Sequence, residues 1–160
     1  MDHVAVWPYA IPMDSSGRMI DDYQGIYSRG LCRAFAEGLL RTRLCEVAAC
    51  LPIVTIGGVT SWAVTGKEWS LDEVLEKQLP EGIEFVTVGT MSIAKRVELH
   101  VRLVSRSRRS LLLNQHFDYP RAQFLDGLSE VVAVMAATTV GRRLSEEENQ
   151  RLQHWGTSSP

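Results

Sequence analysis

Two neighbouring stretches of this chain alternate apolar and polar residues with a period of two. The alternating apolar positions are Val97, Leu99, Val101 and Leu103 in the first stretch, and Leu111, Leu113 and Phe117 in the second. A β-strand needs this period when one of its faces is buried and the other is wet. The polar segment 105–109 between the two stretches predicts a turn, so the chain must contain an antiparallel hairpin with one face on a core.

A turn near Ser107 gives this hairpin a definite register. The expected opposite pairs are Leu103 with Leu111, Val101 with Leu113, and Val97 with Phe117 on one face, and His100 with Asn114, Glu98 with His116, and Arg96 with Asp118 on the other. Two of the polar pairs join groups of opposite or chargeable character, which supports the hairpin because directly opposite side chains interact.

Three further apolar runs predict strands. Val4 to Trp7 is closed by Pro8, residues 44–51 are stopped at Pro52, and Ile83 to Val88 reads as a buried central strand ending at Gly89. Short apolar runs bounded by Pro or Gly are typical of buried strands. The five strands, at about residues 3–8, 44–50, 83–90, 95–105 and 110–118, are expected to share one mixed sheet.

Four segments carry the signals of helices. They are residues 27–41, residues 71–79 before Pro80, residues 120–140 before Gly141, and a short polar segment from 146 toward Trp155. The second and fourth begin with capping boxes, Ser70 with Glu73 and Ser145 with Glu148, in which Ser and Glu satisfy free N–H groups. Trp69 and Val74 flank the first box as a hydrophobic staple. The expected order is β-α-β-loop-α-β-β-β-α with a polar tail.

The segment from Ile53 to Trp69 is rich in Gly, Thr and Val and predicts a long connection with some extended structure. Connections of this length often have a function or are flexible. Trp62 lies within it, and an exposed Trp62 would be able to anchor a protein partner. The alternative is that Trp62, like Trp7 and Trp69, anchors the core or a loop.

The composition is that of an ordinary globular domain. The chain has 160 residues, 45% hydrophobic and 22% charged, with a net charge of −2, so it has no overall attraction to nucleic acid or an anionic membrane. Its longest apolar run is too short to cross a bilayer, and its start lacks the features of a signal peptide, so we expect no membrane insertion and a cytoplasmic location. Cys32, Cys45 and Cys50 fit small buried thiols better than a disulfide or a metal site.

Motifs of catalysis are missing from the sequence. It has no glycine-rich phosphate loop, no Cys-x-x-Cys, no His-Glu-x-x-His and no nucleophile elbow. One face of the hairpin carries His100, His116, Glu98 and Asp118, for which a metal site is one interpretation and cross-strand pairing is the simpler one. We expect no enzyme activity, no cofactor and no bound metal.

Five segments follow one another in the order seen in a known domain family. They are the apolar strand with Pro8 and Tyr9, Ser28 to Leu31 at the first helix, Ser61 to Lys67 before the second helix, the strand Phe85 to Thr90, and the hairpin 97–117 followed by a helix. Over about residues 3–140 this order resembles the TolB N-terminal-like (FlgO-like) domains, which also occur ahead of tetratricopeptide repeats.

The resemblance implies a three-layer α/β/α fold similar to the anticodon-binding domain of synthetases. Its five-stranded mixed sheet would have the order 2-1-3-4-5 with strand 4 antiparallel. The family's role is not catalytic, since its members belong to envelope assemblies or stand at the head of repeat and cyclase proteins. Residues 1–141 would form this domain, and residues 142–160 a polar helix and linker.

The hairpin is strongly basic near its turns. Its cations are Lys95, Arg96, Arg102, Arg106, Arg108 and Arg109. They could grip the phosphates of RNA, for which a synthetase-like fold would be natural. The simpler interpretation is a solvated turn that protects an edge strand, since no aromatic residue is interleaved with these charges. On that interpretation, changing the four arginines from Arg102 to Arg109 together to Ser should cost less than about 1 kcal/mol.

The tail offers little apolar surface beyond Leu144, Leu152 and Trp155. We therefore expect residues after Leu144 to pack weakly on the domain, or to pair with a neighbouring copy through Trp155. The sequence as a whole predicts a non-catalytic protein-interaction, scaffolding or regulatory module from a larger protein or complex. It would bind a protein partner, with self-association possible, and RNA binding is the alternative.

Overall fold

The computed structural model describes residues 2–7, 9–10, 26–48, 53–56, 59–62 and 68–153. Its main sheet contains β1 (His3–Val6), β2 (Glu46–Ala48), β5 (Ile83–Ile93), β6 (Arg96–Ser105) and β7 (Ser110–Pro120). Their order is β2-β1-β5-β6-β7. β1 is parallel to both of its neighbours, and β6 is antiparallel to both β5 and β7. The predicted mixed sheet, with its fourth strand antiparallel, is therefore confirmed.

The predicted long connection contains a small structure of its own. β3 (Ile53–Ile56) and β4 (Val59–Trp62) pair as an antiparallel two-stranded ribbon separate from the main sheet. The extended structure expected there is thus a hairpin.

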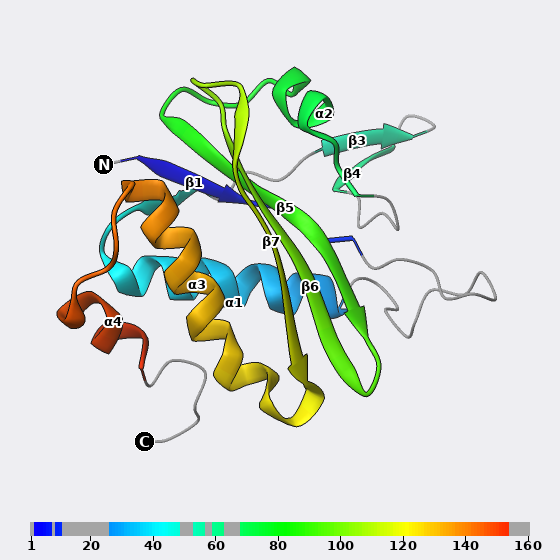
Figure 1. Ribbon diagram of the computed structural model, residues 1–160. Helices are drawn as coiled ribbons and strands as arrows, with labels where there is room; N and C mark the ends of the chain where they lie inside the picture. Colours follow the sequence, from blue (N-terminus) through cyan, green and yellow to red (C-terminus); the bar gives the residue numbers. More distant parts are fainter. Residues whose placement is uncertain are drawn as a thin grey trace.

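Helices cover the sheet on both faces, which gives the three layers (Figure 1). α1 (Ile26–Thr42), α3 (Phe124–Val140) and α4 (Glu146–Leu152) lie on one face. α2 (Leu71–Glu76) lies on the other face and packs on a smaller part of it. The two hydrophobic clusters between these layers are therefore unequal in size.

The larger cluster joins α1 and α3 to the sheet through residues such as Phe35, Leu99 and Met135, all of which are fully buried. The smaller cluster lies under α2. In it the ring of Trp7 meets that of Trp69 edge to face, with centroids 5.2 Å apart. The two tryptophans are core anchors, as predicted, and Trp69 packs in the same cluster as Val74.

The helix ends follow the predicted local chemistry. Both capping boxes are present, at Ser70 with Glu73 and at Ser145 with Glu148. α3 follows a short 3₁₀ turn and ends at Gly141, whose φ of 71° suits a residue without a Cβ. α2 ends at Glu76, earlier than expected, because Lys77 is already extended.

The predicted hairpin register is wrong by two residues. Leu103 lies opposite Leu113, not Leu111, and Leu99 lies opposite Phe117. Ser105 pairs with Ser110, so the centre of the turn lies half a residue beyond Ser107 and the pairing is displaced by one residue. An irregularity between Leu103 and Val104 displaces it by one residue more. Leu113 and Phe117 keep their predicted face because their displacement is two residues, whereas Leu111 pairs with Val104 and packs in the smaller cluster on the other face.

The expected end of the third main strand at Gly89 is also wrong. β5 continues to Ile93, and Gly89 lies fully inside the sheet. A side chain there would collide with the carbonyl oxygen of His100 and with the ring of Tyr9. Gly89 thus permits a close approach between neighbours.

The described part of the tail, which ends at Gln153, does not pack weakly. Leu152 is 2% exposed and belongs to the larger cluster, and Leu144 packs against that cluster. Arg151 donates a hydrogen bond from Nη1 to the carbonyl oxygen of Thr42 at the end of α1, over 2.8 Å. Two leucines and a set of hydrogen bonds are therefore enough to hold α4 on the domain.

Candidate interaction surfaces

The face of β6 below α2 carries a closed polar cluster. Glu68 Oε1 lies 2.8 Å from Arg102 Nε and 3.3 Å from His100 Nδ1. The Arg102 guanidinium also donates to the carbonyl oxygen of Trp69. Arg102 is thus half-buried and held within the fold by its charge partner and a main-chain acceptor.

His100 and His116 lie opposite each other in this cluster. Their rings stack at 4.3 Å with an angle of 12° between the planes, and His100 Nε2 is hydrogen-bonded to Asn114 Oδ1. No group of three or more His, Cys, Asp or Glu within the described residues could hold a metal ion. His100 and His116 therefore make a cross-strand contact and Asp118 pairs across the strands with Arg96, whereas Glu98 lies opposite Asp118 and not His116 as predicted.

The six cations of the basic hairpin do not form one surface. Lys95 and Arg96 lie at one end of β6, and Arg106, Arg108 and Arg109 lie beyond its other end. A ten-residue strand separates the two groups by about 30 Å at 3.3 Å per residue. The predicted strand over residues 95–105 already implies this separation, which the closeness of the cations along the chain conceals.

Half of these cations are already engaged. Arg96 Nε contacts Asp118 Oδ1 at 2.7 Å, and Arg102 contacts Glu68. Arg106 donates from Nη1 to the carbonyl oxygen of Ile83 at 2.8 Å and to that of Pro80 at 3.2 Å. Arg102 and Arg106 therefore help to hold the fold together. The expectation that Arg102, Arg106, Arg108 and Arg109 could all be replaced by Ser with little loss of stability does not fit these contacts.

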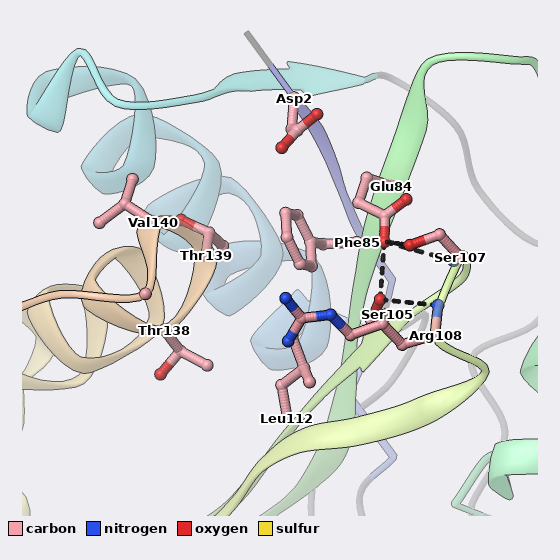
Figure 2. Close-up of a pocket in the computed structure, with 11 residues that line it drawn as sticks. Asp2, Glu84, Phe85, Ser105, Ser107, Arg108, Leu112, Thr138, Thr139 and Val140 are labelled. Carbon is pink, nitrogen blue, oxygen red and sulfur yellow. Dashed lines mark hydrogen bonds between the residues drawn. The ribbon is translucent and has the colours of Figure 1, made fainter.

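A hollow of about 340 Å³ lies between the turn after β6 and the end of α3 (Figure 2). Glu84 stands at its wall and accepts hydrogen bonds from Ser105 Oγ and Ser107 Oγ, both at 2.6 Å, and from the Ser107 main-chain N–H. Although burial acts in the opposite direction, these hydrogen bonds and the charge of Arg106 hold the pKa of Glu84 below its usual value. Glu84 is thus an ionised carboxylate that fixes the turn.

A strongly apolar hollow lies between α1, the β5–β6 turn and the start of α3. This apolar groove has a volume of about 380 Å³ and is lined by Gly30, Leu31, Ala34, Met91, Ile93, Val97, Arg121, Phe124, Leu125 and Leu128. Arg121 is the charged residue of this lining, and Leu125 at its rim is 59% exposed. An exposed large apolar side chain beside an apolar hollow is a typical feature of a binding surface.

Sequence reasoning missed the apolar groove because three separate segments build it. Leu125 was one sequence signal for this groove, because it is an apolar residue on the exposed side of a helix whose buried face is otherwise regular. Leu40 in α1 is a second leucine of this kind, 53% exposed, but it does not line the groove.

The described cysteines are reduced thiols inside the fold. Cys45 is buried, and Cys32 is half-buried with its Sγ 3.1 Å from the carbonyl oxygen of Val6. Burial raises the pKa of each to about 11, well above the usual 9. Both fit the predicted buried thiols, and Cys50 lies outside the described residues.

Comparison with solved structures identifies a related fold. TolB from Acinetobacter baumannii superposes on this chain with a TM-score of 0.55 and 16% sequence identity, over 88% of this chain. The fold is TolB-like. The match covers 28% of the TolB chain, so this chain spans less than a third of the length of that structure. The predicted resemblance to the TolB N-terminal fold is confirmed at the level of fold.

Two more distant structures were also found. The hypothetical protein CT253 from Chlamydia trachomatis has a TM-score of 0.44 at 10% identity, covering 99% of this chain and all (100%) of that one. A PelC dodecamer from Paraburkholderia phytofirmans has a TM-score of 0.44 at 13% identity, covering 90% of this chain and 89% of that one. No family model and no curated protein sequence matches this chain.

The two tryptophans predicted to meet a partner are not placed by this TolB-like structure. Trp62 lies in β4, opposite Ile53, but its side chain is outside the described residues, as is the whole of Trp155. Their roles stay predictions. None of the helices in the described ranges is long and apolar enough to cross a membrane.

Proposed function

We propose that this chain is a non-catalytic protein-interaction module that acts as a scaffolding or regulatory part of a larger protein or complex. The apolar groove beside Leu125 would be its contact surface. The observation that carries this proposal is the pairing of an apolar hollow of about 380 Å³ with a leucine that is 59% exposed at its rim.

The chemistry of the lining indicates what kind of partner would fit. Apart from Arg121, the groove offers aliphatic and aromatic surface from Leu31, Met91 and Phe124. Burying one large apolar side chain there would contribute about 1.5–3 kcal/mol, and an acidic neighbour could pair with Arg121. A partner segment with an apolar anchor next to an acidic residue is the best match.

The polar clusters favour a structural role over catalysis. Glu68 and Glu84 are engaged by neighbouring side chains, and Arg102 and Arg106 are held by main-chain carbonyl groups. These side chains already contact partners within the fold, which leaves them less capacity to bind a substrate. That the protein has no enzymatic activity and no cofactor is part of the proposal.

No specific observation favours the RNA-binding alternative, since five of its six cations lie at two distant ends of β6, Arg102 lies within the strand, and half of the six are engaged. The likeness to one part of the longer TolB chain supports the idea of a module within a larger assembly. The tetratricopeptide context and the cytoplasmic location stay predictions from the sequence.

The test is a comparison of two leucine variants in cells that express the protein. Leu125→Asp places a charge at the rim of the groove, whereas Leu40→Asp makes the same change at an equally exposed position away from it. We expect the wild type and Leu40→Asp to co-purify the same partner, and Leu125→Asp to lose it by at least about tenfold, the equivalent of 1.4 kcal/mol.

Equal recovery of every partner by all three proteins would refute the groove as the contact surface. The unfolding midpoints of both variants should stay near that of the wild type, since exposed substitutions change stability by about 0.5 kcal/mol or less. A loss of binding by both variants, with unchanged stability, would point to α1 or to a surface shared by both leucines.

A further inference from the structure

The long strand β7 forms an open border of the main sheet (Figure 1). It pairs with β6 on one side only, and no other described residue hydrogen-bonds to its outer main-chain groups. Every second residue of such an edge directs its N–H and C=O away from the sheet, which makes it a template for another strand. The opposite border, β2, is only three residues long.

β7 lacks the features that usually protect an edge. From Ser110 to Tyr119 it has no Lys or Arg, and Asp118 is its one carboxylate. The central residues Asn114, Gln115 and His116 are all exposed and have polar side chains that can form hydrogen bonds. Edge strands that must stay single usually carry lysines, an internal proline or inward-pointing charges.

A second surface continues this edge toward α3. A hollow of about 450 Å³ lies beside β7 and is lined by Arg108, Leu112, Val134, Ala137, Thr138, Gly141, Arg142 and Arg143. Leu112, Val134 and Ala137 give it an apolar floor, and the arginines gather at the end where β7 begins. Glu130 is exposed one helical turn before Val134, toward the end where β7 finishes.

We propose that this chain pairs with a second copy of itself through β7, in antiparallel orientation about the Asn114–His116 midsection. The two five-stranded sheets would join into one continuous sheet, related by a two-fold axis. This proposal concerns a surface separate from the apolar groove and does not rest on the proposed function.

Charge favours a second copy over an unrelated strand. An antiparallel two-fold brings the start of one β7 beside the end of the other, so the arginine end of each copy meets the Glu130 end of its partner. Arg108 has no ion pair among the described residues, and Glu130 has none either. Each Arg108 would therefore face a Glu130 of the other copy, and the two-fold axis makes this contact between opposite charges twice.

Sedimentation velocity over a range of concentrations tests the proposal. The wild type should form dimers, and Gln115→Lys should weaken dimerisation at least about tenfold, because it places two ammonium groups near the two-fold axis. Gln150→Lys on α4 is the matched control and should dimerise like the wild type, since Gln150 is also exposed but lies away from β7.

Charge exchange between copies tests the orientation. Glu130→Arg alone and Arg108→Glu alone should each weaken dimerisation, whereas an equimolar mixture of the two variants should dimerise again, since each contact then joins opposite charges. Restoration cannot come from a folding defect in either variant. A monomeric wild type at all concentrations, a Gln115→Lys variant that dimerises normally, or a mixture that stays monomeric would overturn the proposal.

Discussion

Arg142 donates two parallel hydrogen bonds to Glu148, from Nη1 to Oε1 at 2.8 Å and from Nη2 to Oε2 at 2.9 Å. The main-chain N–H of Ser145 donates to the same carboxylate at 2.7 Å. Two-pronged contacts of this type are among the stronger polar interactions in proteins. One carboxylate thus closes the turn between α3 and α4 and caps the start of α4.

These contacts make the attachment of α4 sensitive to acid. The hydrogen bonds from Arg142, followed by that from the Ser145 main chain, lower the pKa of Glu148 from the usual 4.5 to about 2. A carboxyl group with a lowered pKa in the folded state stabilises the fold fully above about pH 4.5 and loses this effect as the pH falls toward 2. Glu148→Gln should therefore be less stable than the wild type near neutral pH, and the difference should shrink between pH 4.5 and 2. Unfolding in denaturant at a series of pH values measures the difference, and a difference that does not change with pH would contradict this account.

Leu152 gives α4 its apolar anchor. It is 2% exposed within the larger cluster, so Leu152→Ala should lower the free energy of unfolding by about 2–5 kcal/mol. Gln150→Ala on the exposed side of the same helix should change it by about 0.5 kcal/mol or less. Equal and small effects of both changes would mean that α4 opens independently of the domain, as the sequence alone suggested.

Gly89 and Gly30 give a matched pair of glycine changes with opposite signs. A Cβ at Gly89 would meet the carbonyl oxygen of His100 and lie 2.8 Å from Tyr9 Cε2, so Gly89→Ala should destabilise the fold by at least about 1–3 kcal/mol. Gly30 lies in α1 with nothing within 4 Å of such a Cβ, so Gly30→Ala should stabilise by about 0.5–1 kcal/mol. Thermal unfolding of the two variants separates these expectations. A destabilised Gly30→Ala variant would show that α1 has a contact on that side.

The basic hairpin contains arginines that hold the fold together and arginines that are exposed to solvent. Arg102 is held by Glu68 and the Trp69 carbonyl group, so Arg102→Ser should cost about 1–3 kcal/mol by leaving these groups unpaired. Arg109 is exposed at the turn, and Arg109→Ser should stay within about 0.5 kcal/mol of the wild type. Chemical denaturation of both variants provides the measurement. If Arg102→Ser proved as neutral as Arg109→Ser, the polar cluster under α2 would have no structural role.

Local patterns in the sequence were enough to predict most of the fold. Alternation with a period of two located β6 and β7, and the serine–glutamate pairs located the starts of α2 and α4. The strand order came from the family resemblance and not from periodicity. Each of these signals is contained in a few consecutive residues, or in the order of the segments along the chain.

Features that depend on distant neighbours could not be predicted. The observed hairpin register differs from the predicted one because the turn and the irregularity between Leu103 and Val104 together displace the pairing by two residues. A periodic pattern of apolar residues does not reveal such a displacement. Gly89 resembled a strand end because its close neighbours, Tyr9 and His100, are far away in the sequence. The tail resembled a linker because Leu152 has its partners on α1 and α3, and the apolar groove was missed for the same reason.

The central claim, that the apolar groove is the surface that binds a protein partner, is tested most directly by covalent capture at its rim. A photoreactive phenylalanine derivative replaces Leu125 in one protein and Leu40 in another, at two leucines of similar exposure. After irradiation in cells, the account predicts a cross-linked partner from the protein labelled at Leu125 and none from the protein labelled at Leu40. A cross-link only from the protein labelled at Leu40, or from neither, would contradict it.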